Sequence, residues 1–340
     1  MKLKPLSMKR SGPVKKSVMM TAVFLSCILN VYALDNLHFN VFGREYACGM
    51  GMRLGISGLQ MTETVYAGSS NDVSGRLLSE IKWDMGAQIT AGAELCIAPA
   101  DLFAKIGLSL EGSLWWHFPV NDRSMKDTDW DDNGSKLIYG ESIASALAGM
   151  EAEGRLAVHF PIRNKYLIET SAEAWYGRYA VIAHDGWTSW IGSGEKTPLY
   201  GTAVEYLQEW ILFAPGLGLR RKLSNGHIGV RAAVSPLVWG YHIDNHYFRT
   251  LESGDPDQKY IRYTDITKGG IYYMIQAGWS WNAARYVQMG ITVNYRAIQK
   301  SRGDTTVSTA GLAGDSFLDK GTAGAAIRTF GVDLTIRTAL

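Results

Sequence analysis

The sequence predicts an all-β protein, a ten-stranded antiparallel transmembrane β-barrel with long loops on one side. Three observations predict this class. Several segments alternate apolar and polar residues over ten or more positions. The apolar series end in aromatic residues, and short turns alternate with long polar connections, as is typical of outer-membrane barrels. After residue 33, no stretch reaches the ~20 consecutive apolar residues of a membrane-spanning helix.

Residues 1–33 are a predicted signal peptide. They hold six Lys or Arg residues and no acid, then an apolar run over 18–29, and they end in a small-x-Ala pattern at Val31-Tyr32-Ala33. A membrane-spanning helix is one alternative, but the run is shorter than a span requires. A lipidation box that ends in Cys27 is another. Residues 34–340 are then a single barrel domain.

The charge of the mature chain argues against one class of partner. Of the 34 basic residues, six lie in the signal peptide, so 28 remain against 32 acids, a net charge of −4. That balance gives no support to nucleic-acid binding and would suit a cationic partner. With 46% hydrophobic and 19% charged residues, the chain does not have the composition of a disordered protein.

Period-two alternation is clearest in four segments, 105–116, 150–160, 287–297 and 330–340. Strands of soluble sheets seldom exceed about ten residues. Trp116, Phe160 and Tyr295 lie at the ends of apolar faces, as residues of an interfacial girdle do. A soluble β-sandwich shows the same alternation with its apolar face toward a core, so periodicity alone leaves that alternative open.

The connections predict the number of strands and the side that carries function. Short connections at 99–101, 161–165, 222–226 and 282–285 alternate with long ones near 67–75, 128–137, 187–203, 247–259 and 300–319. Four short turns and five long loops give ten strands, with both termini on the short-turn side. Because loops carry chemistry more often than tight turns, we expect the functional site at the long-loop rim. We also expect a monomer.

Strand parity assigns the two cysteines that follow residue 33. Cys48 belongs to an outward series, whereas Cys96 belongs to an inward series. That inward series is predicted to contain Glu80, Lys82, Asp84 and Glu94 as well. Residues on opposite faces of a sheet cannot be bridged, so no disulfide is expected.

A pair of acids stands at the outer end of the third strand, where the sequence reads Asp127-Thr128-Asp129-Trp130. Their spacing by two predicts that both carboxylates point into the same cleft. Carboxylates this close resist joint ionisation, which raises at least one pKa and leaves a group able to hold a water or a proton. A solvated acidic loop and a calcium site are the alternatives for this Asp-rich run.

An Asp-x-His pair stands at the outer end of the seventh strand. Asp244 and His246 are two residues apart and share a face, so the carboxylate can orient the imidazole and stabilise its protonated form. Such a His is a suitable general base near neutral pH, although most Asp-x-His pairs are ordinary loop residues. Apolar parity changes at Ser235-Pro236, which predicts a bulge that returns this pair to the lumen.

These features together resemble the omptin family of outer-membrane proteases, ten-stranded barrels with an Asp pair facing an Asp-His dyad across an extracellular groove. The matching stretches are 56–58, 63–66, 78–83, 125–130 and 244–247, in the same order over nearly the whole mature chain. Matched by motif, Asp127 and Asp129 are the Asp pair, and Asp244 and His246 are the dyad. The resemblance implies that His246 deprotonates a water that attacks the peptide bond, with no acyl-enzyme, no cofactor and no metal.

Two departures from the family pattern bear on its ligands. The family selects Arg or Lys with an early Glu and a second acid two residues before the dyad Asp. Glu63 matches the first of these substrate-binding positions, but His242 occupies the second. The family also binds lipopolysaccharide phosphates through outward basic residues. Arg178 matches one of these lipid-binding positions, whereas Glu209 stands where another Arg is expected.

The resulting expectation is an aspartic-type endopeptidase in the outer membrane, with its active site on the extracellular side. Its partners would be peptide or protein substrates, with a preference for basic sites, and outer-membrane lipid. The alternative from another class is a barrel without catalysis that serves as an adhesin or surface receptor, which the change at His242 would suit. A general porin fits poorly, because side chains largely fill a ten-stranded barrel.

Overall fold

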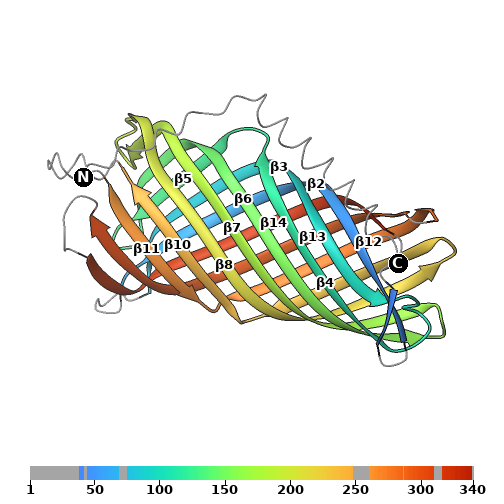
Figure 1. The fold of residues 1–340 in the computed structure, drawn as a ribbon. Coiled ribbons are helices and arrows are strands. Elements are labelled where there is room, and N and C mark those ends of the chain that lie inside the picture. The colour runs from blue at the N-terminus through green and yellow to red at the C-terminus, as the bar shows by residue number, and fades with distance from the viewer. Residues whose placement is uncertain are drawn as a thin grey trace, which may run out of the picture.

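The computed structural model describes residues 38–41, 44–68, 75–247, 260–285, 287–309 and 316–338. These residues form a single antiparallel sheet of fourteen strands that closes on itself (Figure 1). The predicted signal peptide, 1–33, lies outside the described residues. The strands are β1 (His38–Val41), β2 (Arg44–Tyr66), β3 (Leu77–Pro99), β4 (Gly107–Pro119), β5 (Arg123–Trp130), β6 (Lys136–Ile162), β7 (Tyr166–Trp190), β8 (Thr197–Leu223), β9 (Gly226–Ser235), β10 (Val238–His246), β11 (Ile261–Lys268), β12 (Ile271–Ala284), β13 (Val287–Thr309) and β14 (Ser316–Thr338).

The predicted ten-stranded barrel is confirmed. The last strand, β14, pairs along the first long strand, β2, and this pairing closes the ring. Three of the ten barrel strands are interrupted, which divides them into β4 and β5, β9 and β10, and β11 and β12. The short β1 pairs with the beginning of β2. Closure pairs the backbone amides of the strands with each other, which is what allows such a wall to face hydrocarbon.

The two ends of the barrel differ, as the sequence predicts. At one end the connections are tight: β6 ends at Ile162 and β7 begins at Tyr166, with Arg163 and Asn164 between them in the left-handed region at φ 51° and 54°. At the other end, however, the connections at 187–203 and 300–319 are shorter than expected, because β7, β8 and β13 extend into them. Strands of 23 to 27 residues far exceed the ~9–11 that cross a bilayer, so the barrel wall continues beyond the apolar zone.

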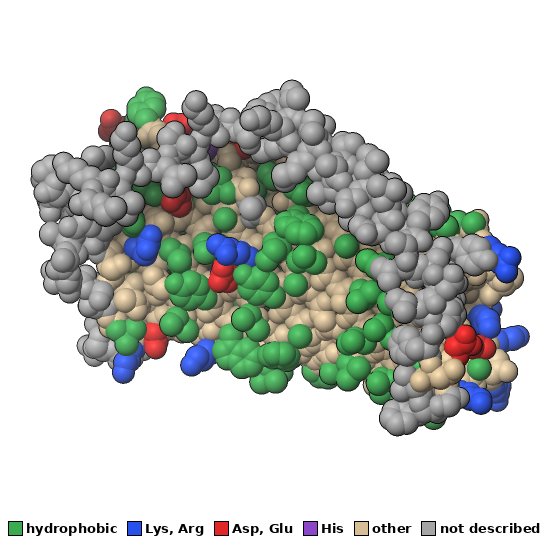
Figure 2. Space-filling view, in the orientation of Figure 1, with side chains coloured by type: hydrophobic (Ala, Val, Ile, Leu, Met, Phe, Trp, Pro, Cys, Tyr) green, Lys and Arg blue, Asp and Glu red, His purple; other side chains and the backbone are tan. Residues whose placement is uncertain are grey.

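The outer wall carries an apolar belt. On β14, Phe330, Val332, Leu334 and Ile336 point outward and are exposed, and Arg328 follows them toward the long-loop end. Figure 2 shows hydrophobic side chains spread over the middle of the wall, with charged side chains chiefly toward its ends. This exposed apolar band is the surface expected of a barrel embedded in lipid rather than of a soluble sandwich.

Within the described part of the chain, no helix has the length and hydropathy needed to span a bilayer.

The interior has an apolar layer toward the long-loop end and a charged layer toward the turns. The largest fully buried side chains of the apolar layer include Trp83, Tyr206 and Trp210. In the charged layer, Arg231 pairs with Glu153 at 2.9 Å and with Glu173 at 3.2 Å. Further ion pairs join Arg155 to Glu111 and Glu169, and Arg296 to Glu151 and Glu153. These side chains fill much of the lumen, which argues against a general porin.

The predicted change of parity at Ser235-Pro236 is confirmed. Ala233 and Ser235 are buried at the end of β9, whereas the even-numbered residues of β10 are buried. The Ser235 hydroxyl donates to the Phe213 carbonyl at 2.5 Å and accepts from the Leu237 amide at 2.9 Å. These two hydrogen bonds satisfy backbone groups where the ladder is interrupted. At the interruption, the buried positions change from odd-numbered residues in β9 to even-numbered residues in β10.

One predicted parity is wrong. Glu80, Lys82 and Asp84 point away from the lumen, and Ile81 and Trp83 are buried in their place. The cause is an irregularity in β3: Gly86 has φ +56°, and the register with β2 shifts between Gly58 and Gln60. Beyond this point the even-numbered residues of β3 face inward, so Cys96 is buried as predicted. Cys48 and Cys96 are both free, which confirms that no disulfide joins them.

Candidate active site

One wall of the candidate site is the strand that carries the Asp pair. Asp127 and Asp129 belong to β5 and share the parity of Met125, whose side chain is buried in the apolar layer. β5 lies between β3 and β6, and the Ser79 hydroxyl of β3 lies 3.5 Å from an Asp127 carboxylate oxygen. The structure therefore gives both acids the inward direction predicted from their spacing.

The opposite wall carries the Asp-His pair. Asp244 and His246 are buried on β10, and the His246 Nε2 atom lies 2.5 Å from the Asp244 Oδ2 atom. The ring of Tyr263, from the neighbouring β11, packs edge-on against the imidazole with centroids 5.3 Å apart. The hydrogen bond to Asp244 and the aromatic contact with Tyr263 thus hold the imidazole, with the Nε2 atom facing the carboxylate.

The two walls approach each other just below these residues. Trp83 of β3 and Tyr206 of β8 stack across the lumen, with ring centroids 5.6 Å apart and planes within 7°. Tyr206 is the register partner of Asp244, and Trp83 is two residues from Ile81, the register partner of Asp127. The stacked rings therefore form a floor between the wall with the Asp pair and the wall with the dyad.

Three buried carboxyl groups meet at the dyad, and one of them is the dyad's own Asp244. Glu63 of β2 faces Asp244 of β10 across the lumen and shares a hydrogen bond with it. The third is Asp265 of β11. Glu63, Asp244 and Asp265 are 3%, 2% and 4% exposed. One oxygen each of Glu63 and Asp265 has no hydrogen-bond partner, which leaves two buried acceptors for a donor from a ligand.

Burial determines how these groups titrate. Glu63 and Asp265 lie on the long-loop side of Ile56 and Ile266, which are exposed apolar residues of β2 and β11. Burial, together with the charges of Asp244 and Asp265, raises the pKa of Glu63 well above its usual value. Burial also raises the pKa of Asp265 to about 6, against a hydrogen bond from Thr305 that lowers it. Each carboxyl would ionise more easily with a cation beside it.

His242 lies at the base of this group. Its ring is buried, its Nε2 atom lies 3.1 Å from the Thr267 hydroxyl, and it packs against Trp210 with ring centroids 4.7 Å apart. The Nδ1 atom has no hydrogen-bond partner. His242 is therefore a well-packed wall residue next to Asp265, its register partner on β11.

Asp265 is the residue that sequence reasoning missed. It stands in no motif, and it precedes Ile266 in a segment with no other functional signal. The structure brings it to the site because β10 and β11 pair so that Asp265 lies opposite His242. An expected acid is absent at His242, and a different acid is present on the adjacent strand. Asp265 could have been found from the sequence only by predicting the register between β10 and β11 across the intervening loop.

The predicted lipid-binding residue lies away from these groups. Arg178 of β7 points outward, and its Nε atom lies 3.3 Å from a carboxylate oxygen of Glu209 on β8. Its side chain is half exposed on the outer wall. Glu209, which stands where the family pattern has an arginine, thus pairs directly with Arg178. The charges of these two side chains balance each other.

No cluster of three or more His, Cys, Asp or Glu side chains with the geometry of a metal site occurs in the described segments of the chain. The acids of the candidate site are instead arranged around an imidazole and a hydrogen-bonded carboxyl pair.

The fold and the site define a class: an outer-membrane type β-barrel with an acid-rich, imidazole-containing site inside its long-loop end. The model of the omptin family matches residues 45–337, and the chain belongs to this family. A search of curated protein sequences finds no match.

The comparison with solved structures gives a strong match to an outer-membrane protease and much weaker matches to other barrels. The outer membrane protease OmpT from Escherichia coli superposes with a TM-score of 0.73 at 16% identity, over 86% of this chain and 96% of that chain. The outer membrane protein OprG from Pseudomonas aeruginosa, with 7% identity over 85% and 95% of the two chains, reaches only 0.32. The translocator domain of the autotransporter NalP from Neisseria meningitidis, with 9% identity over 94% and 97%, reaches 0.26. The OmpT match supports the barrel architecture.

Proposed function

We propose that this protein is an endopeptidase of the outer membrane, with its site on the extracellular side and peptides or proteins as substrates. The observation that carries the proposal is the hydrogen-bonded pair of Asp244 and His246 on one wall, with Asp127 and Asp129 directed inward from the other. Family membership and the likeness to the OmpT protease support the same activity.

The reaction we propose needs no acyl-enzyme. Asp244 engages Nε2 of His246, so Nδ1 would accept a proton from a water molecule as the water attacks the peptide carbonyl. Asp244 stabilises the imidazolium that forms, and general-base assistance of this kind contributes about 10²- to 10⁴-fold in rate. Asp127 and Asp129 would hold the water from the opposite wall and could take up or return a proton. The imidazolium then protonates the leaving amine.

The same site would favour basic residues at the cleavage position. Glu63 and Asp265 each have a buried carboxylate oxygen without a partner, close to Asp244. An Arg or Lys side chain between them would supply donors to both and stabilise their ionised forms. We therefore propose that Asp265 supplies the second acid of the substrate site, at the place where His242 lacks one.

Cleavage of a peptide library, with products identified by mass spectrometry, tests the proposal. The wild type should cut preferentially beside Arg or Lys, and His246→Ala and Asp127→Ala should each reduce turnover by about a hundredfold or more. Thr128→Ala, next to Asp127 on the outward face of β5, is the matched control. Unchanged turnover in His246→Ala would refute the mechanism. Absence of any cleavage by the wild type would favour the adhesin or receptor alternative.

A further inference from the structure

A serine, a histidine and an aspartate on the outer wall form a hydrogen-bonded row that the proposed peptidase does not use. The Ser145 hydroxyl of β6 lies 3.1 Å from the Nε2 atom of His184 on β7, and the His184 Nδ1 atom lies 2.9 Å from a carboxylate oxygen of Asp185. A hydroxyl, an imidazole and a carboxylate in this order have the arrangement of a Ser-His-Asp triad, which is recognised by geometry and not by sequence position. We call these three residues the outer-wall triad.

An irregularity of β7 creates the contact between His184 and Asp185. Consecutive side chains of a regular strand point to opposite faces, so neighbours in sequence are normally kept apart. Here Asp185 has φ 46°, and the registers of β7 with β6 and with β8 both skip it. The other carboxylate oxygen of Asp185 accepts a hydrogen bond from the Gly201 amide of β8 at 2.8 Å. The bulge and this bond therefore hold the carboxylate against the imidazole, and bulges are frequent next to active sites.

Ser145 stands beside an interruption in the neighbouring strand. The pairing of β6 with β5 ends one residue before Ser145, and its pairing with β4 begins at Gly149, so residues 145–148 have no register partner in β4 or β5. The register with β7 also shifts between Ala146 and Ala148. Backbone amides of a strand point to alternate sides. We therefore expect the amides of this segment that face the interruption to supply donors for an oxyanion formed at Ser145.

The outward neighbours of Ser145 on its own strand are apolar. Ile143 is 43% exposed and Leu147 is 59% exposed, and Ser145 lies between them. Toward the turn end of β6, Met150 is the register partner of Trp116, an exposed aromatic residue of the predicted girdle. Girdle residues mark the interface of the membrane with water. The triad thus lies just beyond the apolar belt, where an acyl chain beside Ile143 and Leu147 would bring its ester carbonyl to Ser145.

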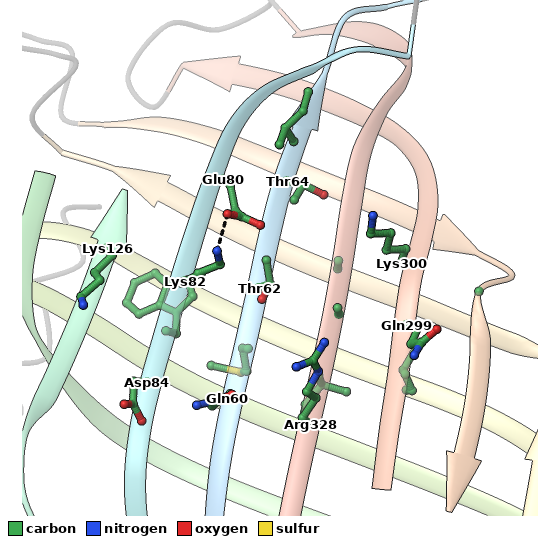
Figure 3. Close-up of a pocket in the computed structure, with 18 of the residues that line it drawn as sticks. Gln60, Thr62, Thr64, Glu80, Lys82, Asp84, Lys126, Gln299, Lys300 and Arg328 are labelled. Carbon is green, nitrogen blue, oxygen red and sulfur yellow. Dashed lines mark ion pairs between the residues drawn. The ribbon is translucent and has the colours of Figure 1, made fainter. Parts of the chain in front are cut away.

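Another serine of the outer wall serves as a comparison. The hollow drawn in Figure 3, on the side of β3, β2, β14 and β13, is lined by one serine, Ser124 of β5, and its lining contains no histidine. Ser124 is the register partner of Ile143 and, like it, faces outward. An outward serine close to the same apolar residue therefore differs from Ser145 in having no imidazole in its hollow.

Asp122 restrains the Ser145 hydroxyl in this structure. A carboxylate oxygen of Asp122 lies 2.6 Å from the Ser145 Oγ atom, which is closer than the Nε2 atom of His184. A hydroxyl has one proton, so donation to Asp122 excludes donation to His184. Asp122 is exposed and lies in the connection between β4 and β5. A substrate that displaces this side chain would leave the hydroxyl proton to the imidazole.

We propose that the outer-wall triad hydrolyses carboxylic esters that have an apolar acyl chain. As the Ser145 Oγ atom attacks the ester carbonyl, the His184 Nε2 atom accepts the hydroxyl proton and Asp185 stabilises the imidazolium. The oxyanion collapses, and the leaving alcohol takes the proton from His184. Water then attacks the acyl group on Ser145 while His184 accepts its proton. That proton returns to Oγ as the carboxylic acid leaves, so one ester and one water give one acid and one alcohol.

The test is labelling of the full chain, in neutral detergent, by an alkyl fluorophosphonate, with the labelled residue identified by peptide mass mapping. The wild type should be labelled at Ser145, and His184→Gln should slow this labelling by about a hundredfold or more. Asp122→Ala should be labelled at least as fast as the wild type. The matched control, Ser124→Ala, should be labelled at Ser145 as the wild type is. His246→Ala should be labelled equally, because the proposal does not rest on the peptidase site.

Three results would overturn the triad: no label on Ser145 of the wild type, an unchanged rate in His184→Gln, and slower labelling of Asp122→Ala, which would make Asp122 the proton acceptor. Loss of the label in His246→Ala would move the reactivity to the candidate active site and overturn it as well. Circular dichroism shows whether each variant keeps its sheet, and the mapping of the wild type needs no variant.

The substrate class is tested with 4-nitrophenyl esters. The octanoate should be hydrolysed about tenfold faster than the acetate or more, because its chain can contact Ile143 and Leu147. Equal rates would overturn the assignment of an apolar acyl chain. Release of octanoate from dioctanoyl phosphatidylcholine would support a membrane lipid as the source of the ester, whereas hydrolysis of the nitrophenyl octanoate alone would support a soluble ester.

Discussion

Replacing Asp265 with Asn should weaken cleavage beside basic residues and at the same time stabilise the folded barrel. Asp265 is 4% exposed, and one of its carboxylate oxygens has no partner in the protein. In the proposed complex this oxygen accepts a hydrogen bond from the cationic side chain of the substrate. A hydrogen bond to a charged group contributes about 1.5–3 kcal/mol. Asn keeps an acceptor oxygen but no charge, so Asp265→Asn loses the charge-assisted part of this bond, and kcat/KM for Arg peptides should fall by at most about 10- to 150-fold.

The opposite effect on stability follows from burial. Burial raises the pKa of Asp265 from 3.8 to about 6, which corresponds to an ionisation penalty of about 3 kcal/mol in the folded state at neutral pH. Asn has nearly the same shape and no charge, so Asp265→Asn should unfold at a higher temperature than the wild type. A gain in stability with a loss of activity is the combination expected of a strained functional group.

The assay compares kcat/KM for two peptides that differ only by Arg or citrulline at the cleavage position, with thermal unfolding measured on the same preparations. Asp265→Asn should lower the Arg value far more than the citrulline value. Thr264→Ala, at the outward neighbour on β11, is the control and should change neither ratio nor unfolding temperature appreciably. An equal loss on both peptides, or a lower unfolding temperature in Asp265→Asn, would refute the assignment of Asp265 to the basic subsite.

Three further outcomes follow from the structure. Cleavage of Arg peptides should decline as pH falls through about 6, because Asp265 becomes protonated there. Since the pKa of Asp265 is raised, its contribution to stability moves the other way and is lost as pH rises through about 6. Kinetic and thermal pH series measure both effects. Gly86→Ala should lower the unfolding temperature by an amount equivalent to about 1–3 kcal/mol, because φ is +56° and a Cβ would lie 2.2 Å from the Arg123 Nε atom; an unchanged melting curve would contradict this. Dialysis against a strong chelator should leave turnover unchanged if water is activated by His246 alone, and a loss that zinc or calcium restores would instead indicate a metal site.

The sequence predicted the architecture well, because a barrel is encoded by a repeated local rule. Alternation over long segments marks the strands, and the contrast between tight turns and longer connections gives both their number and their direction. The interruption between β9 and β10 at Pro236 was also predictable, because apolar parity changes on its two sides and proline disrupts a ladder. The strand ends were less predictable, because 300–309 is polar and still pairs within the sheet.

The irregularity at Gly86 shows where this reasoning fails. Charged residues at 80, 82 and 84 have the spacing of a lumen-facing series, and a single glycine gives no warning that the parity reverses. The structure places their side chains on the outer wall and puts Trp83 against Tyr206 instead. A reversal of this kind depends on pairing with the neighbouring strand, which local sequence does not contain.

The sequence by itself determined the closed barrel, the two walls on which the candidate acids and the imidazole lie, and the family to which they belong. Only the tertiary structure decided which side chains meet: that Glu63 reaches Asp244 across the lumen, that Asp265 lies opposite His242, and that Arg178 is paired with Glu209. The physical reason is that alternation encodes the face of a residue, whereas register and ring closure determine its neighbours.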